Sequence, residues 1–553
     1  MPEYLSPGVF VEEVDRGPKP IEAVGTAMAA FVGFSEKAEL VREVNGEVIT
    51  ESLLNTPQLV TNWSQFVQSY GEFVEGAYLP HAVYGYFNNG GSRCYIVSVK
   101  TIGQAQAPLI GADGKPHLIA RAVHSGFGGL RLRVRVDVPE LPKSTSGTRK
   151  STKAKEEEGK EEGGGSSPGD EADLPPFTVT VERRGTSGAW MTSEVFQDVT
   201  LVEVEQDGAK RVQVAYKNNR APQLIELVVP EEAPLEKAWP KAQEQSLTLE
   251  QKQLAAPTSS EFRGNVRERS GVEGLEALDN VTMLCVPDLV STPPGEDLDL
   301  DMVKAVQTAM IAHCERLGDR VAIVDAPPDM LPQEIGQWRM DTAGYDSSYA
   351  ALYYPWIQVD DPVLNRAIYV PPCGHIAGIW ARNDNTRGVH KAPANEVVQG
   401  AVGLAYNTTK GEQDTLNPIG VNCVRAFPGR GIRVWGARTL SSNPSWRYIN
   451  VRRLFNMVEK SIENGTQWVV FEPNDPFLWA RVRRDVGAFL TTVWSSGALF
   501  GASPGEAFYV KCDEELNPSE SRDLGRLIIE IGMCPVKPAE FVIFRISQWA
   551  GPG

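Results

Sequence analysis

The end of the chain places the strongest constraint on its fold, because three runs of strand-forming residues lie there in succession. The runs are Ala507–Cys512, Arg526–Ile531 and Glu540–Trp549, and each is rich in Phe, Tyr, Val, Ile or Leu. The third run almost reaches the last residue, so we expect nothing after it to cover its free edge. Because an exposed apolar edge pairs readily with another chain, the third run is predicted to be an arm.

The start of the chain carries a similar signal. Gly8–Val14 is a short strand pattern, and the Pro-containing segment Arg16–Pro20 separates it from the rest of the chain. We expect both arms to add to the sheet of a neighbouring subunit, pivoting at Gly17-Pro18 and at Pro535–Pro538. The arm strands are predicted to contain Val9, Phe10, Val11 and Val14 at one end, and Phe541, Val542, Ile543, Phe544 and Ile546 at the other. The acceptor sheet is predicted to contain Phe508, Tyr509, Val510, Leu527, Ile528, Ile529 and Ile531.

Length and composition exclude several classes of protein. A chain of 553 residues is too long for one ordinary core, and a formal net charge of −17 argues against a dedicated nucleic-acid binder. The seven Cys show no C-x-x-C pair, which favours reduced, packed thiols and folding in the cytosol. The start lacks a signal-peptide pattern, and no apolar run is long enough to cross a membrane.

The body of the chain is predicted to be an α/β core, a sheet of alternating strands and helices, with an inserted antiparallel β domain. Strand and helix signals alternate in residues 23–100 and again in 271–424, whereas residues 101–270 carry short alternating segments. Residues 1–22 form the N-terminal arm and hinge, 425–534 a C-terminal α/β domain, and 535–553 the C-terminal arm. Within the insertion, residues 143–175 are rich in Ser, Gly, Lys and Glu and are predicted to be a disordered loop.

Catalytic and metal-binding patterns are weak. Gly501-Ala-Ser-Pro-Gly505 matches the serine-hydrolase motif, but a helix is predicted before it and a strand after it, which is the reverse of the required order. Cys373, His375 and His390 lack partners at metal-ligand spacing. Asp360-Asp361 and the alternating Asp297, Asp299 and Asp301 are better explained as solvated turns. We therefore predict no catalytic, cofactor-binding or metal-binding residue, and no cofactor.

Positive charge gathers between Arg425 and Arg484. This stretch has ten Arg and one Lys against three Glu and one Asp, inside an acidic protein. Two interpretations stay open: internal ion pairs, or a basic face for an acidic partner. On the second interpretation the candidate contacts are Arg452, Arg453 and Lys460, because the apolar residues of this predicted helix fall on another face.

Several segments resemble contractile tail sheath proteins, which belong to phages and phage-like contractile injection systems. Met1–Val14 and Pro535–Phe544 carry the resemblance most closely, and Tyr78–Tyr95 and Pro371–Ala381 extend it over nearly the whole chain outside the insertion. The resemblance implies a structural subunit that polymerises as six-subunit rings around an inner tube and contracts to drive the tube into a target. It also implies that the C-terminal domain faces the tube.

The same resemblance implies partners and a location. The partners would be other copies of the chain, the inner tube protein, and baseplate and tail terminator or cap proteins, with no nucleic acid and no insertion into a membrane. Assembly is expected in the cytoplasm of the producing bacterium, with release in an extracellular particle or virion as a further expectation. The alternative from another class is a cytosolic, oligomeric α/β enzyme with a β insertion, which no catalytic motif in the sequence supports.

Overall fold

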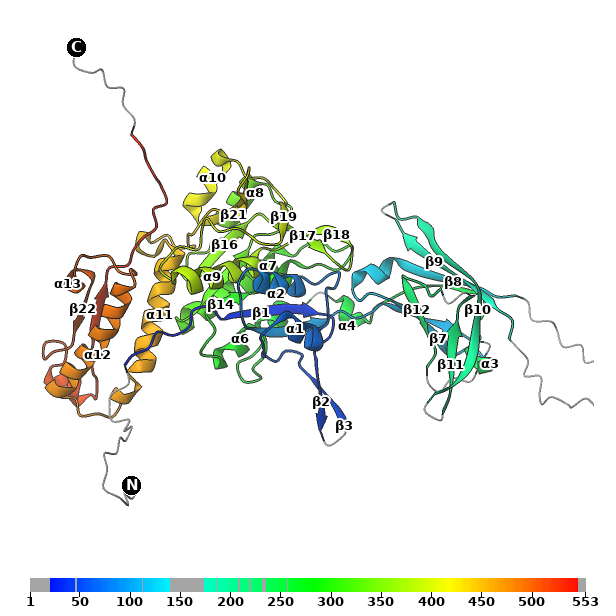
Figure 1. Cartoon of the computed structure of the whole chain (residues 1–553), viewed down its shortest axis with the longest axis horizontal. Coiled ribbons are helices and arrows are strands. Elements are labelled where there is room, and N and C mark those ends of the chain that lie inside the picture. Colours follow the sequence, from blue (N-terminus) through cyan, green and yellow to red (C-terminus); the bar gives the residue numbers. More distant parts are fainter. Residues whose placement is uncertain are drawn as a thin grey trace, which may run out of the picture.

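The structure, a computed structural model, describes residues 20–44, 47–111, 113–139, 174–185, 187–206, 209–217, 220–230, 235–255 and 257–545. The body is elongated, with a C-terminal module at one end, a mixed α/β core in the middle and an outer β module at the other end (Figure 1). The predicted arm residues Val9, Phe10, Val11, Val14 and Ile546 lie outside the described residues. The mixed α/β fold with several sheets agrees with the prediction.

An eight-stranded sheet forms the centre of the core, in the order β21-β20-β16-β15-β14-β1-β5-β4. The six inner strands run parallel, and the two edge strands, β4 and β21, run antiparallel to their neighbours. Every residue of β1 is buried, as expected for a parallel sheet that is covered on both faces. The strands are β1 (Ala29–Ser35), β4 (Gln58–Val60), β5 (Cys94–Thr101), β14 (Met283–Cys285), β15 (Val321–Asp325), β16 (Ala350–Tyr354), β20 (Val421–Phe427) and β21 (Gly431–Val434).

Helices cover the two faces of this sheet, and successive residues of β1 point to opposite faces. Ala29 and Phe31 belong to the core that includes α1, α2 and α9, whereas Ala30 and Val32 belong to the core that includes α7. The helices of the α/β core are α1 (Trp63–Tyr70), α2 (Leu79–Asn88), α7 (Leu300–Leu317), α8 (Pro332–Gln337), α9 (Cys373–Arg387) and α10 (Lys410–Leu416). Single-turn and irregular helices are η1 (Phe127–Arg131), η3 (Leu275–Ala277), η4 (Pro287–Val290), η5 (Trp338–Ala343), η6 (Asn417–Ile419), η7 (Pro444–Trp446) and η8 (Gln467–Val469).

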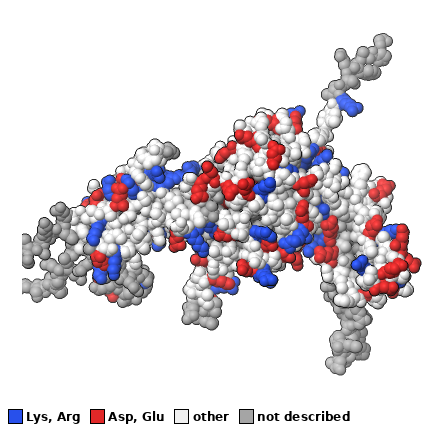
Figure 2. Space-filling view, turned by 180° about the vertical axis from the view of Figure 1, so that it is seen from behind, with Lys and Arg blue, Asp and Glu red and all other residues white. Residues whose placement is uncertain are grey.

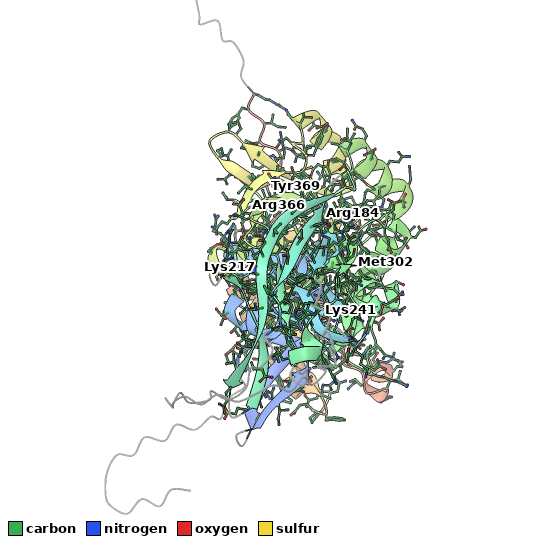
Figure 3. The ribbon with its side chains drawn as sticks, turned by 90° about the vertical axis from the view of Figure 1, so that its right-hand side faces the viewer. Arg184, Lys217, Lys241, Met302, Arg366 and Tyr369 are labelled. Carbon is green, nitrogen blue, oxygen red and sulfur yellow. The ribbon has the colours of Figure 1, made fainter. Side chains whose placement is uncertain are left out.

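Strands β6 to β13, which lie between β5 and β14 in the chain, form the outer module, which Figure 3 shows end-on with Arg184 and Lys217 labelled. It contains a five-stranded sheet, β11-β10-β9-β8-β13, and a three-stranded sheet, β12-β7-β6. Its strands are β6 (Gln106–Ile110), β7 (Pro116–Ala122), β8 (Leu132–Asp137), β9 (Phe177–Arg184), β10 (Trp190–Gln206), β11 (Ala209–Ala215), β12 (Ile225–Val228) and β13 (Gln243–Ser246). Short helices accompany or follow them: α3 (Leu235–Ala238), α4 (Gln251–Leu254), α5 (Ser259–Arg263) and α6 (Gly271–Gly274).

Two smaller sheets decorate the core. Strands β2 (Glu39–Val44) and β3 (Glu47–Ser52) form an antiparallel ribbon that projects from one side of the body (Figure 1). Strands β17 (Ile357–Asp361), β18 (Arg366–Val370) and β19 (Ala401–Leu404) form a three-stranded sheet on the upper side of the core in the same view.

The C-terminal module is built on two long helices and a two-stranded sheet. Its elements are α11 (Ile449–Gly465), α12 (Pro476–Ser495), α13 (Pro504–Ala507), β22 (Phe508–Lys511), α14 (Ser519–Asp523) and β23 (Glu530–Met533). Leu454, Val458, Val482 and Leu490 lie in its separate hydrophobic core. The α/β sheet runs on through β20 and β21, so it does not end at the boundary predicted between residues 424 and 425.

The predicted loop 143–175 is too long at its C-terminal end. Residues 143–173 lie outside the described residues, but Leu174 packs against the hydrophobic core and the Pro175 carbonyl accepts a hydrogen bond of 3.0 Å from Trp239 Nε1. Composition could not reveal this, because the apolar partner is distant in the sequence.

Candidate assembly surfaces

The small sheet of the C-terminal module presents two free edges. Strands β22 and β23 pair antiparallel with each other, with Phe508 opposite Met533 and Val510 opposite Ile531, and no third strand joins them within the part of the chain that the structure describes. Tyr509 Oη donates across the sheet to Glu530 Oε1 at 2.7 Å. Unpaired edges of this kind are ready acceptors for a further strand.

Four of the seven predicted acceptor residues lie in this sheet, namely Phe508, Tyr509, Val510 and Ile531. The other three, Leu527, Ile528 and Ile529, precede β23, so the prediction of a strand from Arg526 was wrong at its start. The Asn517 side chain explains the difference: its Nδ2 donates to the Ile528 carbonyl at 3.0 Å, and its Oδ1 accepts from the Ile528 N–H at 2.7 Å. A side chain therefore binds the backbone groups that a strand would pair.

The chain after β23 stays close to the body until Glu540. Pro535 forms a bridge with Leu499, and the Val536 N–H donates to the Ala498 carbonyl at 3.2 Å. The pivot predicted at Pro535–Pro538 is therefore not a free hinge in this structure, because its backbone is bound to the C-terminal module.

The next segment, Phe541–Phe544, leaves the body as an extended, unpaired chain (Figure 1). Its four apolar side chains are 70–83% exposed. Exposure of several consecutive apolar residues to water is unfavourable. This segment therefore has the properties of a strand that can pair with a strand of another chain.

Glu540 ties the root of this arm to the α/β core. Its carboxylate accepts hydrogen bonds from Arg438 Nε at 2.9 Å and Arg438 Nη2 at 2.7 Å, and also from Asn417 Nδ2 and Tyr448 Oη. Burial raises the pKa of Glu540, but the hydrogen bonds from Arg438 and Asn417 outweigh it and hold the pKa below its usual range. This clamp was not predicted from the sequence, where its only signal is an acidic residue at the start of an apolar run.

The root of the N-terminal arm is fixed on the other side of the C-terminal module. Ile21 is buried in the core of that module against Gly465, and the Val24 N–H donates to Ser461 Oγ at 3.0 Å. Thr26 then links this segment to the buried ion pair between Arg453 and Asp384, because its Oγ1 donates to Asp384 Oδ2 and its carbonyl accepts from Arg453 Nη2. Both arms therefore start from anchored points.

The candidate basic contacts are not a free surface. The Arg453 side chain is 4% exposed, makes two hydrogen bonds to Asp384 at 2.6 and 2.9 Å and lies over the Trp380 ring. The prediction that Arg453 faces outward was wrong, because α11 packs against the rest of the C-terminal module on its apolar side and against the α/β core on its polar side.

Arg452 and Lys460 are also engaged within the subunit. The Arg452 guanidinium stacks over Tyr349 and Trp446, and it donates to Glu459 at 3.1 Å. Lys460 is 18% exposed and lies 3.8 Å from Asp319. Of the two interpretations of the basic stretch, internal pairing therefore fits these three residues. The C-terminal module also does not present a basic face in Figure 2, where acidic side chains gather at that end of the molecule. The exposed acidic residues of this module include Glu514, Glu515, Glu520 and Asp523.

The residues that suggested chemistry have structural surroundings. Burial raises the pKa of the Cys373 thiol well above its usual value and lowers the pKa of His375 to about 3, so the two do not form a charged nucleophile and base pair. Ser503 is preceded by α12 and a loop rather than by a strand, and only the single turn α13 follows it before β22, so the strand that the hydrolase motif needs before its Ser is not there. Within the described ranges no cluster of His, Cys, Asp and Glu could hold a metal ion.

The paired aspartates also have local roles. Asp361 Oδ1 accepts hydrogen bonds from the backbone of Val363 and Leu364, and its Oδ2 lies 3.1 Å from His81 Nε2. Asp299 caps the start of α7 by accepting from two backbone N–H groups. Among the residues that the structure places, no helix has the length and apolar character needed to cross a membrane.

Comparisons with known proteins identify sequences that are similar to this chain. The model of the phage tail sheath protein central domain matches residues 274–440, and the model of the phage tail sheath C-terminal domain matches residues 441–548. The tail sheath protein of Vibrio phage KVP40 is 30% identical over 211 residues, which are 37% of this chain and 31% of that protein. The tail sheath protein of Salmonella phage ViI is 24% identical over 274 residues, or 43% of this chain and 42% of that protein. The chain thus covers less than half the length of these two relatives.

A solved structure shares the fold along the whole chain. The sheath complex of an extracellular contractile injection system (PVC), solved in its contracted state, aligns with a TM-score of 0.54 and 22% sequence identity over 99% of both chains. At this identity the likeness concerns the fold.

Proposed function

Residues 274–548 belong to the phage tail sheath family, and on that premise we propose that this chain is the structural subunit of a contractile sheath. The observation that supports the proposal most strongly is that one subunit contains both an exposed apolar arm, Phe541–Phe544, and a two-stranded sheet whose edges bind no further strand in the described part of the chain. Each subunit thus offers one strand and one acceptor for a strand, which is the requirement for a continuous chain of strand additions.

In this proposal the C-terminal arm enters the β22–β23 sheet of one neighbour, and the N-terminal strand of Val9–Val14 joins a sheet in the same way. Four backbone hydrogen bonds at roughly 0.5–1.5 kcal/mol each, with burial of Phe541 and Ile543, make a joint worth several kcal/mol. Such joints hold neighbours together while the bodies of the subunits shift relative to one another.

The larger assembly is built on these joints. Subunits form six-membered rings stacked around an inner tube, and a change in their packing shortens the sheath and drives the tube into a target. The C-terminal module faces the tube, the outer β module faces outward, and baseplate and terminator or cap proteins bind the two ends. The energy resides in the arrangement of subunits, so no cofactor or fuel is required. Assembly takes place in the cytoplasm of the producing bacterium, and the product is a phage tail or a released particle.

The alternative, a cytosolic α/β enzyme, has no support in the relatives, which are tail sheath proteins. The residues that would carry chemistry do not favour it either, because Cys373 and His375 are buried with pKa values that keep both uncharged, and Ser503 follows a helix and a loop rather than a strand.

Electron microscopy of the full-length protein tests the proposal, with the chain expressed alone and together with the genes next to its own. We expect rods or tubes from the intact chain, and soluble, folded monomers without rods after removal of residues 1–15 or 540–553. Circular dichroism should hardly change in the two shortened chains, because the cores supply their own burial. Compact particles from the intact chain under all conditions would contradict the sheath function, and normal contracting rods from both shortened chains would contradict the arm mechanism.

A further inference from the structure

The β2–β3 ribbon, residues 39–52, is an exposed element that the proposed arms leave unused. It stands clear of the body in Figure 1, and its side chains Val41, Val48 and Ile49 are 51%, 71% and 49% exposed. A two-stranded ribbon without a covering layer gains little stability from its own contacts. Exposed apolar residues on such a ribbon indicate that something packs against it.

The ribbon is strongly acidic. Residues 39–52 contain four Glu and one Arg. Glu39, Glu43 and Glu51 are exposed, and within the described part of the subunit none of them forms an ion pair. We call residues 39–52 the acidic ribbon. Its partner should therefore carry positive charge beside apolar surface.

The hairpin formed by β20 and β21 has the complementary character. Residues 425–433, which comprise the end of β20, the turn and the start of β21, contain Arg425, Arg430 and Arg433 and no acidic residue, and we call them the arginine hairpin. Arg425 and Arg430 both lie over the Phe427 ring, with guanidinium carbon to ring-centre distances of 5.3 and 5.6 Å. The arginine hairpin thus combines charge with an aromatic surface.

These guanidinium groups are held by neutral acceptors rather than by acids. Arg430 Nη2 donates to Asn395 Oδ1 at 3.1 Å, and Arg433 Nη1 donates to the Asn395 carbonyl at 2.8 Å. Arg425 donates to the Thr408 carbonyl and to Gln413 Oε1. The side chains are therefore positioned, but no acidic side chain of the residues that the structure describes forms an ion pair with them.

The acidic ribbon and the arginine hairpin lie at opposite edges of the main sheet. The ribbon leads directly into edge strand β4, whereas β21 is the other edge strand. Eight strands at a spacing of about 4.8 Å put the two edges roughly 35 Å apart. Figure 1 places β2 and β3 below the body and β21 on its upper side, and in Figure 3 the blue ribbon and the yellow strands again lie at opposite ends. The two elements cannot meet within one subunit.

We propose that the acidic ribbon of one subunit binds the arginine hairpin of a second copy of this chain. The contact is head to tail, since it joins different surfaces of identical chains, and such contacts build rings or helices rather than closed dimers. It rests on the proposed sheath function, which supplies the neighbouring copy. The outer edge of β21 already pairs with residues 395–398, so the ribbon reaches the arginine side chains and does not add a strand to the sheet.

Charge reversal with rescue tests the contact in the full-length protein. One variant carries Glu43→Lys and Glu51→Lys, a second carries Arg430→Glu and Arg433→Glu, and a third carries all four changes. For the first variant the matched control is Glu226→Lys with Glu268→Lys, which makes the same change in net charge at exposed residues elsewhere. We expect each reversed pair to raise the concentration needed for polymerisation by about tenfold or more, and the combined variant to return to within about threefold of the natural protein.

The outcomes separate this contact from the sheath function. Polymerisation of both reversed pairs at the control's concentration would overturn the contact, and so would failure of the combined variant to recover. A second measurement does not need rods: Arg430→Lys should give a carbodiimide cross-link between Lys at 430 and Glu43 or Glu51 of another copy in concentrated solution. If the natural protein never polymerises, the proposed sheath function is wrong. Absence of this cross-link would overturn the contact between the acidic ribbon and the arginine hairpin, whether or not the protein polymerises.

Discussion

Arg438 donates two parallel hydrogen bonds to Glu540, 102 residues further along the chain, and so fixes the point at which the C-terminal arm leaves the core. Glu540 is also bound by Asn417 and Tyr448. The segment that is free to move therefore begins at Phe541 and not at the prolines before it. An anchored root limits the directions that the arm can take towards a neighbour.

Glu540→Gln should loosen the arm more than it destabilises the fold. We expect the free energy of unfolding to fall by only about 1 kcal/mol, because the lost interactions are partly solvated, while hydrogen exchange in residues 536–545 becomes faster. Glu515→Gln, which removes an exposed ion pair with Lys511, is the matched control. Equal exchange rates in the variant and the natural protein would mean that the clamp does not hold the arm.

Acid should release the same clamp. The pKa of Glu540 in the folded chain lies below its ordinary value, so the stabilising contribution is complete above the ordinary glutamate pKa of about 4.3 and is lost as the pH falls through the lower, folded value. Faster exchange at the arm root below about pH 4, absent in Glu540→Gln, checks the prediction.

The ion pair between Arg453 and Asp384 should be a strong structural joint between α11 and α9. Both side chains are almost fully buried, so Arg453→Ala leaves an uncompensated carboxylate and should cost about 3–5 kcal/mol in urea unfolding. Arg484→Ala removes an exposed Arg that pairs with the adjacent Asp485 and should cost less than about 0.5 kcal/mol. Similar losses of unfolding free energy in the two variants would show that burial does not determine how much an ion pair contributes to stability.

Replacement of residues 143–173 by a short Gly-Ser connector should leave both folding and assembly intact. Loop length costs free energy only logarithmically, and this stretch is poor in apolar residues. Extension of the deletion through Leu174 and Pro175 should lower the melting temperature, because it removes the contacts with the outer module's core and with Trp239. Loss of soluble protein with the shorter replacement would contradict the prediction.

Asp325 should make the subunit less stable as the pH rises towards neutrality. Burial raises its pKa to about 7 in the folded chain, above the unfolded value of about 3.9, so between these values the folded chain holds a proton that the unfolded chain releases. Asp325→Asn keeps an oxygen that can accept the hydrogen bond from the Cys373 N–H, which is 2.9 Å between Cys373 N and Asp325 Oδ1 in the natural protein. This variant should remove the dependence of the unfolding free energy on pH in this range. Urea unfolding of both proteins between pH 5 and 8 measures the difference.

The local features of this protein could be predicted from its residues alone. Apolar and helical patterns predicted the strand Arg320–Asp325 and the helix Asp301–Leu317, which the structure has as β15 and α7. The exposed apolar run at Phe541–Phe544 was also predicted, because it depends on side chains that are close in the chain. These signals are local, so a single sequence contains them.

Which polar groups contact one another depends instead on how the helices and sheets pack. The amphipathic pattern placed Arg453 opposite the apolar stripe of α11 and so predicted exposure, yet the core and the N-terminal segment cover that face. Likewise, Ile528 was expected in a strand, but Asn517 binds its backbone instead. Helical and strand periodicity report which side of an element is apolar; they do not report how many other elements surround it, because that depends on contacts between residues far apart in the chain.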